Sequence, residues 1–132
     1  MAERSGNEAK KEIISPAPQP GYPFSRVVGY GGLVFVSGTV GRDPATGKIA
    51  EDIGEQTRQV LENIEAQLAM AGTARDRVLK TTVFLVDMGS FEKMNRAYSG
   101  FFGQDPPARS CVEVRALPDR EALIEVEVIA AR

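Results

Sequence analysis

The stretch Ala-Leu-Ile-Glu-Val-Glu-Val-Ile-Ala, residues 122–130, alternates apolar and charged side chains over most of its length. Successive residues of a strand point to opposite sides of a sheet, so this pattern predicts a strand with one apolar side and one mixed side. Residues 110–115 alternate in the same way, and residues 79–86 form a more continuously apolar run that is typical of a buried strand. We therefore expect three strands of one sheet in the second half of the chain.

Two other segments have the spacing of helices. Apolar side chains recur at three- and four-residue steps between about residues 52 and 71, which predicts a long helix with one buried stripe. A second helix is expected to begin at Ser90 and to end at Gly103. This helix carries a cluster of large side chains: Phe91, Met94, Tyr98, Phe101 and Phe102.

Two short β-rich runs precede the long helix. Residues 26–30 and 33–37 are joined by Gly31-Gly32, a dipeptide that supplies the positive φ of a two-residue hairpin. The order strand, strand, helix, strand, helix, strand, strand predicts an α+β fold. It is expected to be a single domain in which two helices pack on one face of a mixed β-sheet.

The N-terminal part is not typical of a packed element. Residues 1–12 are half charged and show no apolar periodicity, which predicts a mobile N-terminal arm. Four prolines between residues 16 and 23 remove backbone donors, so this stretch is expected to be an extended connector. No internal repeat or second change of composition follows, and the domain is expected to span residues 13–132.

The composition excludes several kinds of site. The 132 residues include no histidine and one cysteine, which excludes a Ser-His-Asp triad, a His-ligated metal site and an intramolecular disulfide. Sixteen Lys and Arg against eighteen Asp and Glu give a net charge of −2, which argues against binding nucleic acid through bulk charge. With no membrane-spanning apolar run, no signal peptide and a single thiol, a cytoplasmic location is expected.

Charged side chains occupy alternate positions in the last two predicted strands. If Val126 faces the helices, Glu125 points the other way. If Val112 also faces the helices, Arg109 and Cys111 share the side of Glu125. Two interpretations stay open for that face: it is solvated, which is the commoner case, or it is buried against other subunits and forms a pocket there.

Such a pocket would have a definite chemistry. The planar fork of Arg109 can pair with a carboxylate, although a salt bridge to Glu113 or Glu127 is the structural alternative. Glu125 can accept a proton from water or orient it, and Gly38 allows a ligand to approach the backbone closely. These groups are sufficient to bind a small carboxylate and to hydrolyse an electrophilic C=N bond, but not a peptide bond.

Four segments carry a resemblance to a known family: residues 34–38 (VFVSG), 56–63 (QTRQVLEN), 80–85 (KTTVFL) and 107–114 (PARSCVEV). Together with IEVE at 124–127, they resemble the RidA/YjgF family, whose members are also called reactive intermediate deaminases or L-PSP endoribonucleases. The resemblance runs in order from about residue 13 to the C-terminus. Its most specific parts are the Pro-Ala-Arg-Ser segment and the closing strand.

The resemblance implies a chorismate-mutase-like fold, a homotrimer with clefts between subunits, and no metal or organic cofactor. It implies hydrolysis of 2-iminobutanoate and 2-iminopropanoate, or their enamine tautomers, to 2-oxo acids and ammonia. By this resemblance Arg109 binds the substrate carboxylate and Glu125 places the water. Further residues that it places in the cleft are Gly38, Asn95 and Cys111, the last in a lining role because no histidine is available to lower its pKa.

The chain departs from the family pattern at two places. Phe24 stands where the deaminases commonly have a tyrosine, so the ring is kept and the hydroxyl is lost. Two roles stay open for Phe24: contact with the substrate, or packing alone. Residues 39–42 read Thr-Val-Gly-Arg, where a Gln and a Pro are usual. Two alternatives to a deaminase therefore stay open: an endoribonuclease acting on single-stranded RNA, and a non-catalytic, chaperone-like trimer that binds a small carboxylate.

Overall fold

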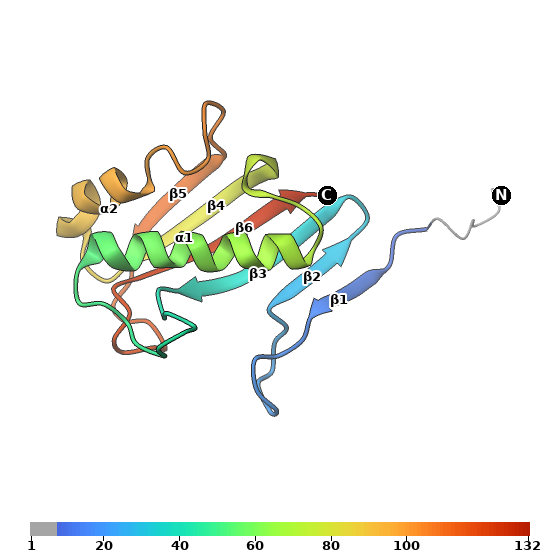
Figure 1. Cartoon of the computed structure of the whole chain (residues 1–132), viewed down its shortest axis with the longest axis horizontal. Helices are drawn as coiled ribbons and strands as arrows, with labels where there is room; N and C mark the ends of the chain where they lie inside the picture. The colour runs from blue at the N-terminus through green and yellow to red at the C-terminus, as the bar shows by residue number, and fades with distance from the viewer. Residues whose placement is uncertain (1–7) are drawn as a thin grey trace.

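Six strands form one mixed sheet in the order β1-β2-β3-β6-β4-β5 (Figure 1). The computed structural model describes residues 8–132. Neighbouring strands pair antiparallel except for β4 and β5, which are parallel. The strands are β1 (Lys11–Ser15), β2 (Val27–Tyr30), β3 (Leu33–Val40), β4 (Val78–Leu85), β5 (Ala108–Glu113) and β6 (Ile124–Ala131).

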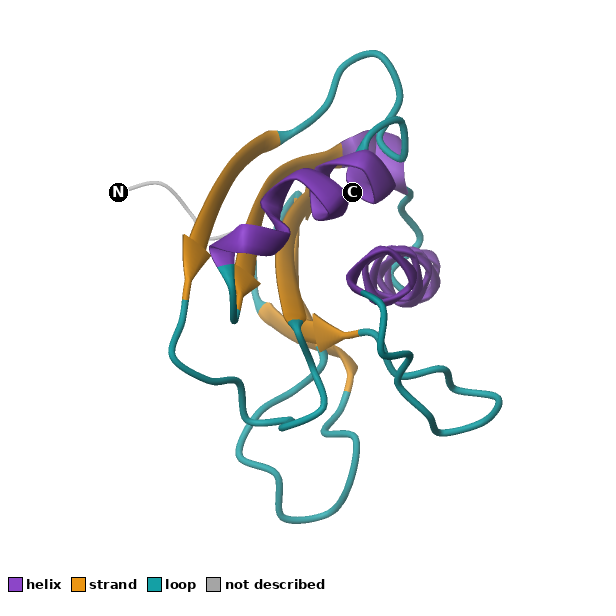
Figure 2. Ribbon diagram, turned by 90° about the vertical axis from the view of Figure 1, so that its left-hand side faces the viewer, coloured by secondary structure: helices purple, strands orange, loops and turns teal. Residues whose placement is uncertain are grey.

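Two α-helices, α1 (Ile53–Met70) and α2 (Phe91–Tyr98), lie on the same face of this sheet (Figure 2). Asp52 caps the first of them, because its side chain accepts a hydrogen bond from the Glu55 backbone N–H at 3.0 Å. Short 3₁₀ helices at Arg75–Arg77 and Met88–Ser90 precede β4 and α2. The predicted α+β fold, with one mixed sheet and two helices on one face, is confirmed.

The first strand was not predicted. β1 begins at Lys11, inside the stretch assigned to the mobile arm, and pairs antiparallel with β2 at the edge of the sheet. Lys11, Glu12 and Ile13 are exposed and only Ser15 is buried, so the sequence of this edge strand shows little apolar pattern. Residues 1–7 of the expected arm lie outside the described residues.

The second helix is shorter than predicted and ends at Tyr98. Ser99 adopts an extended conformation, and its hydroxyl donates to the Asn95 carbonyl at 2.7 Å. Gly100 then takes a positive φ of 85°, a conformation that suits glycine and turns the chain away from the helix axis. The aromatic residues Phe101 and Phe102 therefore belong to the loop after α2, not to the helix.

The hydrophobic core lies between the two helices and the sheet. The predicted stripe of α1 faces this core, since Val60, Leu61, Ile64 and Leu68 are at most 1% exposed. The opposite face of the sheet carries exposed apolar side chains, among them Leu33, Phe35 and Val112. No helix of the described residues covers that second face (Figure 2), which we call the outer face.

Candidate functional site

The pairing of β5 with β4 determines where Arg109 points. Thr81 of β4 pairs with Arg109 on one side and with Val128 on the other. Directly paired residues of neighbouring strands point to the same face of a sheet. Because Thr81 and Val128 are buried beneath the helices, Arg109 also lies on the helix-bearing face.

The same argument places Glu125 on the outer face. It pairs with Phe84 of β4, and Phe84 pairs in turn with Val112 of β5. Val112 is 44% exposed and does not face the helices, so the prediction that Arg109 and Cys111 share a face with Glu125 is wrong within one chain. The prediction failed because β5 is an edge strand, where the apolar side does not have to be the helix side.

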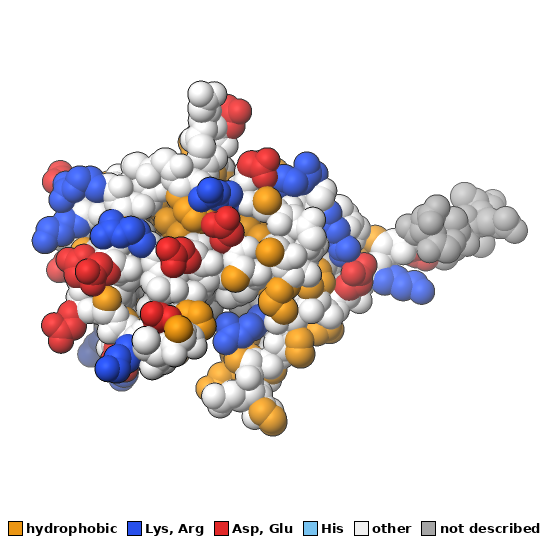
Figure 3. All heavy atoms as spheres, viewed as in Figure 1, with side chains coloured by type: hydrophobic (Ala, Val, Ile, Leu, Met, Phe, Trp, Pro, Cys, Tyr) orange, Lys and Arg blue, Asp and Glu red, His pale blue; other side chains and the backbone are white. Residues whose placement is uncertain are grey.

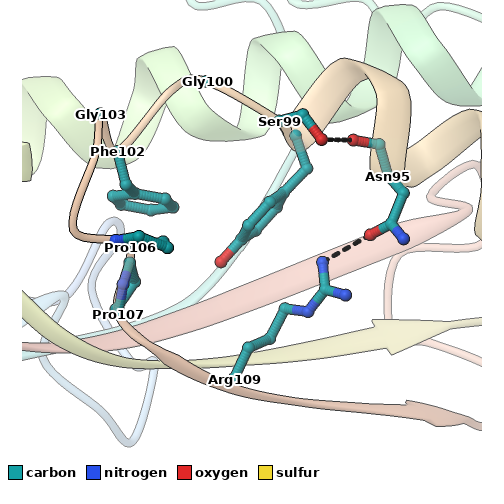
Figure 4. A pocket seen from close by; sticks show the side chains of 9 residues that line it. Asn95, Ser99, Gly100, Phe102, Gly103, Pro106, Pro107 and Arg109 are labelled. Atoms are coloured by element: carbon teal, nitrogen blue, oxygen red, sulfur yellow. Dashed lines mark hydrogen bonds between the residues drawn. The ribbon is translucent and has the colours of Figure 1, made fainter.

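Arg109 is held by three side chains of α2, of which Asn95 is labelled in Figure 4. Its Nη1 donates to Asn95 Oδ1 at 2.7 Å. The guanidinium carbon lies 4.8 Å from the Tyr98 ring centroid and 5.6 Å from that of Phe91. These are cation–π distances. The amide and the two rings orient the guanidinium of Arg109 without neutralising its charge.

Within the described chain Arg109 contacts this neutral amide and forms no salt bridge to Glu113 or Glu127, the structural alternative considered from the sequence. Glu113 instead accepts a hydrogen bond from the Met88 backbone N–H at 2.7 Å. The aromatic contacts with Phe91 and Tyr98 were not predicted from the sequence. Their spacing with Asn95, four and then three residues apart on α2, was the available signal, because such residues share one helix face.

A pocket of about 380 Å³ opens beside Arg109. It is lined by Asn95, Tyr98 and Ser99 at the end of α2, by the loop at residues 100–107, and by Arg109 itself (Figure 4). Phe102 and the two prolines of the loop give one side of the pocket an apolar wall. The pocket therefore combines a cation with an apolar surface, as a small organic anion requires.

Cys111 lies two residues beyond Arg109 in β5 and therefore on the same face. It pairs with Val83 and packs against the hydrophobic core. Burial raises the pKa of the thiol, and the positive charge of Arg109 opposes this only in part. A thiol with a raised pKa is a poor nucleophile at neutral pH. Cys111 is not among the residues that line the pocket beside Arg109, so its lining role stays a prediction. We call Arg109, Asn95 and Cys111 the arginine group.

On the outer face, Glu125 lies against the backbone of Gly38. A Cβ atom on Gly38 would stand 2.5 Å from Glu125 Oε2, so a side chain at this position would displace the carboxyl group. Burial raises the pKa of Glu125, and the negative charges of Glu127 and Asp119 raise it further. Such a carboxyl exchanges protons closer to neutral pH than an ordinary one. We call Gly38 and Glu125 the glutamate group.

Asp119, one of the charges near Glu125, belongs to an ion pair. Its Oδ2 lies 2.7 Å from Arg42 Nη2, and Arg42 also donates to the Gly47 carbonyl at 2.6 Å. The hydrogen bond from Arg42 holds the pKa of Asp119 below its usual range. Arg42 therefore compensates part of the negative charge beside Glu125.

Phe24 lies in the loop between β1 and β2 and is 47% exposed. Its ring is tilted against Tyr22, with 5.7 Å between the centroids. The next residue is anchored to the sheet, because Ser37 Oγ donates to the Ser25 carbonyl at 2.6 Å. The loop that carries Phe24 is thus fixed to β3 at Ser37, one residue before Gly38. The Phe24 ring itself has no hydroxyl that could form a hydrogen bond.

The face of the molecule that carries the helices has no dominant charge. Acidic and basic side chains are interspersed there (Figure 3). In the part of the chain that the structure describes, no three acidic or thiol side chains gather in a way that would hold a metal ion. Neither described helix has both the length and the apolar character needed to cross a bilayer.

Comparisons with known proteins match nearly the whole chain. Residues 14–132 match the family described as Endoribonuclease L-PSP. A RutC family protein of Pyrococcus horikoshii is 48% identical over 123 residues, which cover 91% of this chain and 97% of that protein. A 2-iminobutanoate/2-iminopropanoate deaminase of Salmonella typhimurium is 43% identical over 119 residues, 88% of this chain and 92% of that one. The structure of E. coli TdcF with bound serine is 37% identical, with a TM-score of 0.80 over 92% of this chain and 96% of that chain.

Proposed function

The chain belongs to the RidA/YjgF/L-PSP family, and on that premise we propose that it hydrolyses 2-imino acids to 2-oxo acids and ammonia. The proposed substrates are 2-iminobutanoate and 2-iminopropanoate, which the name of the Salmonella relative specifies for that protein. The observation that carries the proposal is the environment of Arg109. Its guanidinium is held by a neutral amide and two aromatic rings beside an open pocket, an arrangement that favours an anionic ligand.

The substrate site is proposed to form between copies of the chain. The arginine group and the glutamate group lie on opposite faces of one sheet, so a single chain cannot present both to one small molecule. Glu125 shares its row with Phe84 and the exposed Val112, and Phe35 on the same face is 39% exposed. We propose that further copies of the chain cover these apolar side chains and that, in this assembly, the Glu125 of one subunit lies beside the Arg109 of another. A homotrimer provides three such sites.

In this site Arg109 binds the carboxylate of the imino acid through its fork. Water adds to the C2 carbon, and one of its protons passes through the Glu125 carboxyl to the imine nitrogen, which gives an amino alcohol at C2. The hydroxyl proton then passes by the same carboxyl to the nitrogen as the C–N bond breaks. The products are the 2-oxo acid and ammonia, and the raised pKa of Glu125 suits both proton transfers.

The test couples the purified protein to a serine/threonine dehydratase and traps the remaining imine as a semicarbazone. Wild-type protein is expected to suppress semicarbazone formation, and Arg109→Ala to lose about a hundredfold or more of this activity. Arg58→Ala, which removes an exposed arginine of α1, is the matched control and should behave as wild type. Equal activity of wild type and Arg109→Ala would contradict the proposed function.

Phe24 favours a second candidate, a binding protein that holds a small carboxylate without turning over an imine. The hydroxyl that the family deaminases commonly have at this place is missing, and the ring is exposed. A protein of this kind would bind 2-oxobutanoate in calorimetry and show no imine hydrolysis. RNA cleavage, which the family description names, is opposed by the net charge of −2 and by the lack of histidine.

A further inference from the structure

A β-bulge interrupts the pairing of β3 with β6 at the glutamate group. Val36 pairs with Val128 and Thr39 with Val126, so two residues of β3 lie opposite the single residue Glu127. The two residues of the bulge are Ser37 and Gly38. Bulges redirect a strand locally and occur often beside active sites. This one brings the Gly38 backbone against the Glu125 carboxyl.

Side-chain hydrogen bonds on both sides hold the bulge in shape. Thr39 Oγ1 donates to the Ser37 carbonyl at 2.9 Å. Ser37 Oγ donates to the Ser25 carbonyl at 2.6 Å, and the Ser37 backbone N–H donates to the Arg26 carbonyl at 2.9 Å. The conformation at Ser37 therefore sets both the position of Gly38 and the end of the loop that carries Phe24.

A buried glutamine of α1 completes this chain of contacts. Gln67 is 8% exposed, and its Nε2 donates to Thr39 Oγ1 at 3.4 Å. Since Thr39 Oγ1 accepts this bond, its own proton is directed to Ser37. The Gln67 Oε1 atom has no hydrogen-bond partner among the described residues. A buried, unpaired amide oxygen destabilises a fold, and an apolar side chain would fill the same place without this penalty.

We propose that Thr39 and Gln67 are positioning residues for the glutamate group. They connect α1, whose place is fixed by the hydrophobic core, to the bulge that sets Gly38 against Glu125. This inference rests on the proposed function, because it takes Glu125 as the group that moves the proton. It also accounts for Gln67, whose unpaired amide oxygen is unfavourable for stability alone.

The test compares Thr39→Val, which removes the hydroxyl at nearly constant volume, with Thr39→Ser, which keeps it. Thr39→Val is expected to lower kcat about tenfold and to change KM less than about twofold, because the arginine group is untouched. Thr39→Ser should restore most of kcat. Thr57→Val is the matched control: Thr57 is also buried and donates to a backbone carbonyl, that of Ile53 at 2.8 Å, but it lies in α1 away from the bulge.

Gln67→Leu separates positioning from stability. It removes the unpaired oxygen, so the thermal unfolding midpoint is expected to stay the same or rise. It also removes the bond that directs the Thr39 hydroxyl, so kcat is expected to fall while the fold is kept. A stabilised Gln67→Leu protein with the kcat of wild type would show that Gln67 has no positioning role and would overturn the inference for that residue.

Amide hydrogen exchange gives a readout that does not require turnover. In Thr39→Val the segments at residues 36–40 and 22–26 are expected to exchange faster than in wild type and in Thr57→Val. If wild type does not hydrolyse the imine, the proposed function fails, and the exchange result alone decides whether the bulge is held in this way. The inference is overturned by unchanged exchange in both segments, or by an active wild type whose kcat is matched by Thr39→Val.

Discussion

The arginine group and the glutamate group differ in how far a single chain completes them. Arg109 has an amide ligand and two aromatic contacts, all from α2 of its own chain. Glu125 lies instead on an uncovered face, against the Gly38 backbone and near two further negative charges. The contacts of the arginine group are complete within one chain, whereas the proposed partner of the Glu125 carboxyl is not part of the same chain. If the proposed function is right, assembly of several copies is needed for the chemistry of the site as well as for covering the outer face.

The largest expected effect comes from preventing the outer face from being covered. Phe35→Glu places a charge among the exposed apolar side chains of that face and is expected to give a monomer with no measurable imine hydrolysis. The arginine group is unchanged by this substitution, since it lies on the other face. The mass in solution is measured by light scattering, and turnover by the coupled semicarbazone assay.

Met70→Glu is the control for this substitution. Met70 is 61% exposed at the end of α1, on the helix-bearing side, so a charge there should alter neither mass nor turnover. A monomeric Phe35→Glu protein that retained full activity would show that one chain contains the whole site. The arginine and glutamate groups would then not need a second copy of the chain.

A smaller effect distinguishes Glu125 from its neighbour on the same face. Glu125→Gln removes the proton acceptor at constant shape and is expected to lower kcat by about a thousandfold with a small change in KM. Glu127→Gln, two residues further along β6, should change kcat less than about twofold because Glu127 is exposed. Steady-state kinetics of both variants check this. Equal losses in the two variants would mean that the face acts through its total charge and not through one carboxyl.

The smallest expected effect is a shift in the pH profile. The proposed base must be ionised, so activity is lost as the pH falls through the pKa of Glu125, which burial raises. Arg42→Ala would leave the Asp119 charge uncompensated and raise the Glu125 pKa further, so the acidic limb of kcat should move to higher pH by less than about one unit. A shift to lower pH, or none, would show that Asp119 does not act on Glu125.

Arg42→Ala is also expected to change the pH dependence of stability. The pKa of Asp119 is lowered in the folded state, so its ion pair stabilises the fold above the unfolded pKa of an aspartate, and this contribution is lost as the pH falls through the lowered value. In Arg42→Ala the contribution is absent at neutral pH as well. Thermal unfolding of the two proteins should therefore differ at pH 7 and converge in acid.

Much of the fold followed from local pattern. The stripe of α1 and the alternation of β6 each mark a buried side, because the element meets the core over its whole length. β1 left no such mark, since it is an edge strand whose place depends on pairing with β2. The end of α2 was also misplaced, because Ser99 and Gly100 end the helix before the aromatic cluster does.

For the candidate site, the sequence supplied the residue types to consider but not their arrangement in space. The resemblance to the RidA/YjgF family marked Arg109 and Glu125, but alternation within each strand placed them on one face. Which face of β5 meets the helices is set by its parallel register with β4, and that register depends on a crossover through α2 that no local pattern encodes. The bulge in β3 depends likewise on contacts with α1 and with the loop before β2.

The most direct test of the account is complementation between two inactive variants. Arg109→Ala and Glu125→Ala are unfolded together, refolded as a mixture and assayed for imine hydrolysis against each variant refolded alone. If one copy supplies the arginine and its neighbour the glutamate, random mixing should restore about a quarter of the wild-type activity, because one site in four receives both intact groups. If the mixture is as inactive as its components while refolded wild type recovers its activity, the two groups do not meet between copies and the account is contradicted.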